Sequence, residues 1–128
     1  MKKIIILIIA ITVSISCSND DDNSNQSEIE IRLSNTSQVD FKNVIVNTSN
    51  EYVAFGDIDA GQTTEYKIFE TAYRYAFIEL EIDGETYTIQ PIDYVGETPL
   101  ENGKYTYQID ADDSQARYGK LNLTFVED

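Results

Sequence analysis

The sequence contains no histidine, no tryptophan and only one cysteine, and these absences exclude several kinds of chemistry. Without histidine the chain cannot form a Ser-His-Asp triad or a Cys-His pair, and it has no imidazole to act as a general base. The usual zinc sites, which need histidine or several cysteines, are excluded as well. The six glycines occur singly, so there is no glycine-rich loop of the kind that binds phosphate. We therefore predict a protein that is not an enzyme and that needs no cofactor.

Positive charge is scarce too. Nine lysines and arginines stand against 23 aspartates and glutamates, which gives a formal net charge of −14 at pH 7. A strongly acidic surface is repelled by nucleic acids and by anionic lipid headgroups, so we expect no nucleic-acid partner. The charge instead favours solubility, and it suits a cation or a basic partner.

The first residues have the features of a secretory signal. Lys2 and Lys3 are followed by the apolar run Ile4–Ile11, and small residues precede the only cysteine, Cys17. An apolar segment of about 10–12 residues is roughly half of what spans a bilayer as a helix. We therefore predict a signal peptide over residues 1–16 and no membrane-spanning helix there.

The segment Ser14-Ile15-Ser16-Cys17 resembles the lipobox of bacterial lipoproteins that are cut by signal peptidase II. The resemblance implies cleavage before Cys17 and acylation of its thiol, which makes this residue the membrane anchor. Two or three acyl chains hold a protein stably on a bilayer, whereas one holds it only marginally. The acidic stretch that follows is similar to that of Bacteroidota lipoproteins, in which such a cluster can direct export to the cell surface. The implied location is the outer membrane, on its periplasmic face or at the cell surface.

The chain after the cleavage site divides into two parts. Residues 17–27 contain the lipidated cysteine and a polar, acidic segment with nothing apolar to bury, so we predict a flexible tether. Residues 28–128, about 100 in number, are predicted to form a single domain. Loss of the two leader lysines changes the formal charge of the mature chain from −14 to −16.

Apolar residues alternate with polar ones over most of residues 28–128, the period expected of half-buried strands. The first strand begins at Glu28. In the second, the apolar phase shifts between Phe41 and Val44, which predicts a bulge near Lys42-Asn43. Residues 63–70 are predicted to form a strand that is either amphipathic or at the edge of a sheet, and residues 93–103 are predicted to form the longest loop.

The strongest local signal is Asp83-Gly84 between two alternating segments. A type I′ turn needs positive φ at both central residues, which these two residue types tolerate. A two-residue loop pairs Ile82 with Glu85, Leu80 with Tyr87 and so on, which places the large apolar groups on one face. The sequence therefore predicts a hairpin here.

Seven or eight short strands, with turns at intervals of roughly ten residues, predict an all-β domain that is a single antiparallel β-sandwich. A small closed barrel is the alternative. The stretch Leu100–Tyr107 resembles the corner before the penultimate strand of immunoglobulin-like, fibronectin-type and transthyretin-like sandwiches. The resemblance implies an immunoglobulin-like sandwich, in which Leu100 packs under the turn, Gly103 makes the bend, and the Tyr105 hydroxyl bonds to the main chain. Without a cysteine pair or tryptophan, an antibody-type domain is excluded.

Tyrosine is abundant, with nine copies, and the predicted loops carry several of them. Tyr73, Tyr75 and Tyr94 fall in or near loops together with Arg74. Exposed tyrosine and arginine side chains can anchor a protein partner or stack on sugar rings. We predict that these four residues form a ligand- or partner-binding surface of a binding or accessory module. Alternatively, the loop tyrosines only cap the ends of the sandwich, and the strand tyrosines belong to the core, namely Tyr66, Tyr87, Tyr105 and Tyr107.

A cluster of aspartates gives a weaker candidate. Asp110, Asp112 and Asp113 occupy one turn, and oxygen-rich turns can bind calcium. They do not match a twelve-residue calcium loop, so solvated carboxylates are the simpler interpretation. Two other functions stay open: a structural envelope lipoprotein without a ligand, and a calcium-stabilised, adhesin-like domain.

Overall fold

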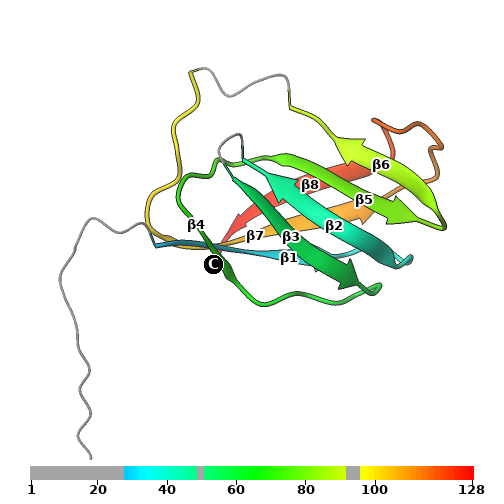
Figure 1. Ribbon diagram of the computed structural model, residues 1–128, viewed down its shortest axis with the longest axis horizontal. Coiled ribbons are helices and arrows are strands. Elements are labelled where there is room, and N and C mark those ends of the chain that lie inside the picture. Colours follow the sequence, from blue (N-terminus) through cyan, green and yellow to red (C-terminus); the bar gives the residue numbers. More distant parts are fainter. Residues whose placement is uncertain (1–27, 49–50, 92–95) are drawn as a thin grey trace, which may run out of the picture.

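The computed structural model describes residues 28–48, 51–91 and 96–128, which form two four-stranded β-sheets packed face to face (Figure 1). The strands are β1 (Ile29–Asn35), β2 (Phe41–Asn47), β3 (Tyr52–Ile58), β4 (Lys67–Phe69), β5 (Phe77–Ile82), β6 (Glu85–Ile89), β7 (Gly103–Ala111) and β8 (Leu121–Glu127). One sheet has the order β4-β1-β7-β8 and the other β3-β2-β5-β6. No described residue is helical, and so none belongs to a helix that could cross a membrane. The prediction of an all-β sandwich is confirmed.

The prediction that the sandwich is purely antiparallel is wrong for one pair of strands. β1 and β7 run parallel in continuous register, from Ile29 opposite Gly103 to Asn35 opposite Ile109. Residue alternation reports which face of a strand is buried, and it says nothing about the direction of a neighbour that lies far away in the sequence. The pairing therefore could not be read from local pattern.

The strand directions gather the connections at two ends of the sandwich (Figure 1). We call one the Glu28 end, which contains Glu28, residues 70–76 and residues 96–102. The other, the Gly84 end, contains the turns at residues 36–40, 59–63, 83–84 and 112–120. The chain ahead of Glu28 therefore joins the domain at the same end as the predicted Tyr73–Tyr75 corner.

The predicted hairpin forms as expected. Ile82 pairs with Glu85, Leu80 with Tyr87, and the register continues to the end of β6. Asp83 and Gly84 have φ angles of 54° and 83°, as a type I′ turn requires. Turn chemistry and hydrophobic phase specify the same register, so this part of the fold is determined locally.

The predicted bulge in β2 is also present. The register of β2 shifts between Phe41 and Val44 against β3, and Asn43 has a positive φ of 52°. The Asn43 amide still has a hydrogen-bond partner at the bulge, because it donates to the Asp57 carboxylate at 3.0 Å. Both Phe41 and Val44 therefore point into the core, where they are fully buried.

The predicted strand over residues 63–70 is shorter than expected. Only β4 pairs with β1, and Thr63 adds an isolated bridge to Ser34. Between them the Thr64 hydroxyl accepts a hydrogen bond from the Leu33 amide at 3.0 Å, so a side chain replaces part of the ladder. The strand lies at the edge of its sheet, which is one of the two predicted alternatives.

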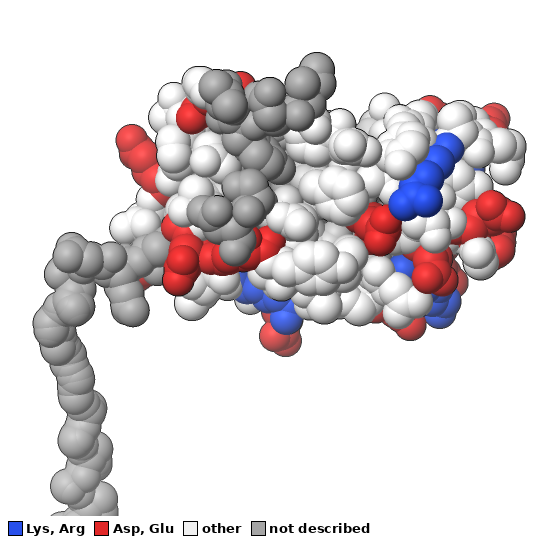
Figure 2. All heavy atoms as spheres, turned by 45° about the horizontal axis from the view of Figure 1, so that its top comes forward, with Lys and Arg blue, Asp and Glu red and all other residues white. Residues whose placement is uncertain are grey.

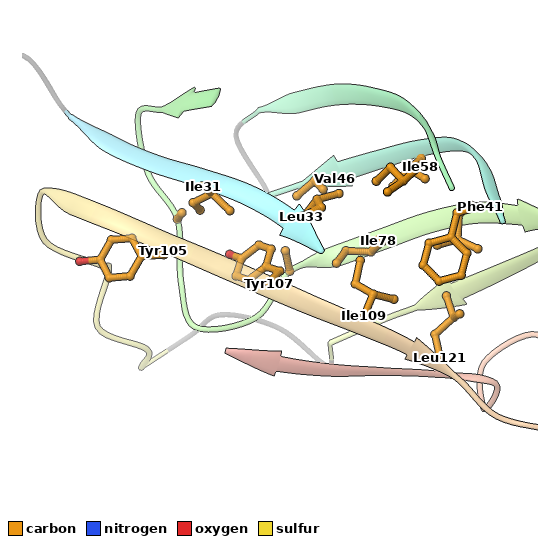
Figure 3. Close-up of a cluster of buried hydrophobic side chains, with 14 of the residues drawn as sticks. Ile31, Leu33, Phe41, Val46, Ile58, Ile78, Tyr105, Tyr107, Ile109 and Leu121 are labelled. Carbon is orange, nitrogen blue, oxygen red and sulfur yellow. The ribbon is translucent and has the colours of Figure 1, made fainter. Parts of the chain in front are cut away.

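Side chains from both sheets form the core (Figure 3). Tyr105 and Tyr107 on β7 both point into it and are buried. The Tyr105 hydroxyl donates to the Glu101 carbonyl at 2.6 Å, which is the back-bond that the corner resemblance implied. The Tyr107 hydroxyl donates to the Tyr73 carbonyl at 2.7 Å. Each buried hydroxyl is therefore satisfied by the main chain of a connection at the Glu28 end.

The buried side chain of Asn35 organises the Gly84 end. Its amide nitrogen donates to the carbonyls of Val39 and Ile58, at 2.8 and 3.0 Å. Its oxygen accepts from the amide and the hydroxyl of Ser37, at 2.9 and 2.7 Å. One buried amide thus joins the end of β1 to the start of β2 and to the end of β3.

Candidate functional site

The two sheets leave an open side where β6 and β8, an edge strand of each sheet, lie next to one another. Part of this side is hollowed into a groove with a volume of about 470 Å³. Its lining comes from the end of β6 and the two residues after it, from β8, and from the corner before β5. We call it the side groove; it is lined by Ile89, Gln90, Pro91, Leu123, Phe125, Arg74 and Tyr75.

The loop between β7 and β8 covers the part of this open side that lies beyond the side groove. The Thr88 amide, on the open edge of β6, donates to the Arg117 carbonyl at 2.8 Å. The Arg117 guanidinium bonds the Thr88 hydroxyl at 3.2 Å and the Glu79 carboxylate at 2.9 Å. The side groove therefore begins where this loop ends, and it extends toward the Glu28 end.

Phe125 connects the groove to the core. Its ring lies 5.4 Å from the ring of Tyr105 and 6.3 Å from that of Tyr107, measured between centroids. Both tyrosines are held by main-chain hydrogen bonds, so the ring that lines the groove rests on a fixed support. A preorganised apolar surface of this kind loses little entropy when a ligand binds.

Arg74 supplies the charge of the groove. Its guanidinium carbon lies 5.4 Å from the Phe125 ring centroid, in the geometry of a cation–π contact. Within the described residues the ion pairs are made by Arg32, Lys42 and Arg117, and none involves Arg74. An arginine that has no carboxylate partner among the described residues, beside an apolar surface, is suited to an anionic group on a ligand.

The protein as a whole is acidic, which makes this cation a local exception. Figure 2 shows a face on which acidic side chains border a broad area of uncharged ones, and on which basic side chains are few. Arg74 is the basic residue among those that line the side groove, so it sets the sign of the group that binds there.

The structure brings together two of the four residues predicted to form the binding surface. Arg74 and Tyr75 line the side groove, whereas Tyr73 does not, and its carbonyl accepts the hydrogen bond from Tyr107. Tyr94 lies outside the described residues, as do Cys17 and the predicted signal peptide and tether.

Sequence reasoning missed the floor of the groove. Leu123 and Phe125 alternate with polar residues on the last strand, and this pattern predicted only that they face inward. They do so, but β8 is an edge strand, so both remain half-exposed on the open side. Nothing in the sequence of this last strand marks it as the end of a sheet.

The aspartate cluster lies at the Gly84 end, away from the side groove. The Asp112 carboxylate accepts the Ser114 amide at 2.9 Å, which forms a local turn. The Lys120 ammonium donates to the carbonyls of Asp112 and Ser114, at 2.8 and 3.0 Å, and lies 5.2 Å from the Tyr87 ring centroid. The Lys120 ammonium is thus already bonded to the carbonyl oxygens that a calcium ion would need in this loop. In the part of the chain that the structure describes, no group of three or more acidic or cysteine residues could hold a metal ion.

A second polar cluster covers the outer face of the sheet that contains β1 and β7. The Tyr66 ring lies between Arg32 and Lys104, whose charged groups are 4.8 and 4.9 Å from its centroid. The Tyr66 and Thr106 hydroxyls donate to the Asp128 carboxylate at 2.8 and 2.6 Å. These groups satisfy one another, so the cluster is structural.

The same contacts shift two pKa values. Burial raises the pKa of Asp128, but the hydrogen bonds from Thr106 and Tyr66 and the charge of Arg32 outweigh it, so the pKa lies below its ordinary value. The hydrogen bond to the Asp128 carboxylate, followed by desolvation, raises the pKa of Tyr66.

The fold and the groove place the protein in the class of two-sheet β-sandwiches with an open side. A similar fold is found among known structures. The NMR structure of a protein from Eubacterium rectale superimposes with a TM-score of 0.54 over 80% of this chain and 94% of that one. The two sequences are 13% identical, so the likeness shows the fold alone. No family model matches the chain, and no match was found among curated proteins.

Proposed function

We propose that the protein is a lipid-anchored lipoprotein of the outer membrane that acts as a non-enzymatic binding or accessory module, with the side groove as its recognition site. The anchor is supported by the Lys2–Cys17 sequence, which resembles a lipoprotein leader. The observation that carries the binding function is the groove itself, a preorganised apolar surface beside an arginine that pairs with no described carboxylate. Pockets that are largely apolar and carry a few polar groups are the usual form of a binding site.

The architecture also supports a finer assignment of the fold. In the immunoglobulin arrangement the first two strands are neighbours in one sheet. Here β1 and β2 belong to different sheets, which supports the transthyretin-like type over the immunoglobulin-like type among the sandwiches that the Leu100–Tyr107 corner resembles. Nuclear Overhauser effects between the backbones of β1 and β2, in place of those between β1 and β7, would contradict the assignment.

Binding at the groove is tested with the full chain against a glycan array and a peptide library. We expect ligands whose affinity falls at least about tenfold in Tyr75→Ala, because truncation of an aromatic anchor costs more than 1 kcal/mol. Tyr118→Ala is the matched control, since Tyr118 is 61% exposed and does not line the groove. Tyr94→Ala tests the remaining residue of the predicted surface. Equal affinity of the wild type and Tyr75→Ala for every ligand would contradict the groove as the recognition site.

The anchor and its location need separate measurements. Mass spectrometry of the amino-terminal peptide of the native protein is expected to find acylated Cys17 as its first residue. An unmodified thiol or an uncut leader would reject the anchor. Brief protease treatment of intact cells then distinguishes display at the cell surface, where the domain is cleaved, from the periplasmic face, where it is protected.

A further inference from the structure

We propose that the side groove receives an extended peptide segment, which adds as a strand to the open edge of β8 and places its alternate side chains in the groove. The inference rests on the proposed function and specifies the chemistry of the partner. It follows from a comparison of the four strands that end the two sheets.

Three of the four edge strands are protected against pairing. β4 has only three residues. The register of β3 against β2 is broken at Gly56, which has a φ of 78°. The edge of β6 is closed at Thr88 by the Arg117 carbonyl, and Pro91, which has no amide hydrogen, follows it. Short length, bulges, proline and covering loops are the usual devices that prevent a sheet edge from pairing.

From Leu123 onward, none of these devices protects β8 among the described residues. It runs for seven residues in unbroken register against β7, from Leu121 to Glu127, without proline, glycine, lysine or a bulge. Among the described residues, β8 pairs with no strand other than β7. Alternate residues of such an edge direct their amide and carbonyl groups away from the sheet, where a further strand can bond to them.

The available edge and the groove coincide. Because the Arg117 loop closes the side next to the start of β8, the open length is that beside Leu123 and Phe125, which line the groove. The five residues from Leu123 to Glu127 span roughly 16 Å in extended form, enough to pair with a short peptide. In strand addition, main-chain bonds supply affinity, and pockets for alternate side chains supply specificity.

The groove also specifies side-chain chemistry. Ile89, Pro91, Leu123 and Phe125 present apolar surface, so every second residue of the peptide is expected to be apolar. Arg74 lies at the same site without a described carboxylate partner, so the peptide is expected to carry an acidic side chain there. A second copy of the chain fits less well, because each copy has a formal charge of −14 and the two repel one another.

The test uses the full chain and a pool of acetylated, amidated hexapeptides with Val, Ile, Leu or Phe at every second position and Glu at either end. A matched pool has Gln in place of Glu. We expect binding, measured by fluorescence anisotropy, to be about two- to fivefold tighter for the Glu peptides, as for an exposed ion pair. This preference is expected to disappear in Arg74→Gln and to persist in Arg117→Gln.

N-methylation of the peptide tests the strand itself without altering the protein. Methyl groups on alternate amides of one peptide edge are expected to weaken binding at least about thirtyfold, because they remove several main-chain hydrogen bonds. Methyl groups on the other edge are expected to leave binding within about twofold, because that edge faces solvent. Hydrogen exchange is expected to slow in residues 123–127 of the protein when the unmethylated peptide is bound.

The outcomes separate this inference from the proposed function. Equal effects of the two methylation patterns, or no binding of any pool member at millimolar concentration, reject strand addition. If a glycan still binds in a manner that depends on Tyr75, the proposed function stands and only the peptide is wrong. If no ligand depends on Tyr75, both are wrong. Sedimentation that finds a dimer with a protected β8 edge would identify a second copy as the occupant and would also reject the peptide.

Discussion

The amide of Thr88 and the carbonyl of Arg117 are joined by a 2.8 Å hydrogen bond, although 29 residues separate them in the chain. This contact links the β7–β8 loop to the open edge of β6. It determines how much of the side between the sheets is covered, and therefore where the side groove begins.

Arg117→Ala is expected to loosen this cover. It removes the bonds of the guanidinium to Glu79 and to the Thr88 hydroxyl, which are partly exposed, so we expect a loss of about 0.5–1 kcal/mol in unfolding free energy. Faster hydrogen exchange at the Thr88 amide is the specific measurement. Arg74→Ala, which makes no such contact, is the control, and equal exchange in both variants would contradict the expectation.

Tyr105→Phe removes one hydroxyl from the corner at the Glu28 end. The lost hydrogen bond to the Glu101 carbonyl is expected to cost about 1 kcal/mol in urea denaturation, with the stacking on Phe125 preserved. Tyr118→Phe, on an exposed side chain, is expected to change nothing measurable. A stability of Tyr105→Phe equal to that of the wild type would mean that the back-bond is not formed in solution.

Stability is expected to fall above pH 10. Desolvation by burial, followed by the charges of Glu127 and Glu101, raises the pKa of Tyr105 above its ordinary value of 10.0. The Tyr105 hydroxyl therefore loses its proton at a lower pH in the unfolded chain than in the folded protein. Its contribution to the free energy of unfolding is complete below pH 10 and is lost as the pH rises through the pKa of the folded protein. Denaturation curves across this range should decline less in Tyr105→Phe than in the wild type. Parallel curves for the two proteins would show that another group governs the decline.

An acid effect is expected from Asp128. Burial raises the pKa of Asp128. The hydrogen bonds from Thr106 and Tyr66 and the charge of Arg32 together lower it by more, so the pKa in the folded protein lies below 3.8. The stabilisation is therefore present above pH 3.8 and is lost as the pH falls through the folded value. Asp128→Asn is expected to be less stable than the wild type near pH 6, with a difference that shrinks in acid. Glu127→Gln is the control, and a difference independent of pH would exclude the carboxylate as its cause.

Calcium is expected to leave the melting temperature unchanged. The Lys120 ammonium already bonds the carbonyls of the aspartate loop, and a divalent ion would have to displace it. Lys120→Met is expected to cost about 1 kcal/mol, because two partly buried carbonyls lose their charged donor. A clear rise in the melting temperature of the wild type with calcium, absent with magnesium, would revive the calcium-stabilised alternative.

The features predicted correctly from the sequence are those determined by neighbours in the chain. Asp83-Gly84 needed only the φ preferences of two residues, and the Asn43 bulge only a shift in apolar phase. The Tyr105 back-bond spans four residues, so a short motif could predict it.

The remaining features depend on residues far apart in the sequence. The parallel pairing joins Ile29 to a residue 74 positions later, and the groove joins Arg74 to Phe125. Tyr66 illustrates the same limit, because alternation allowed it a place in the core, whereas it lies on the outer face between two cations. Which strand ends a sheet is set by the whole topology, and so is the site that an edge creates.

The inner position of β1 in its sheet has a mechanical consequence if the domain is anchored through its amino-terminal side. β1 is bonded to β4 on one side and to β7 on the other, and Glu28, which precedes it, is joined to the rest of the chain at one end of this strand. Tension on Glu28 along the strand loads both ladders in shear, so their bonds resist together, whereas a strand peeled from an edge yields one bond at a time. If Cys17 is fixed in a membrane, the drag of flowing fluid on the domain is borne by a strand that two ladders hold in place.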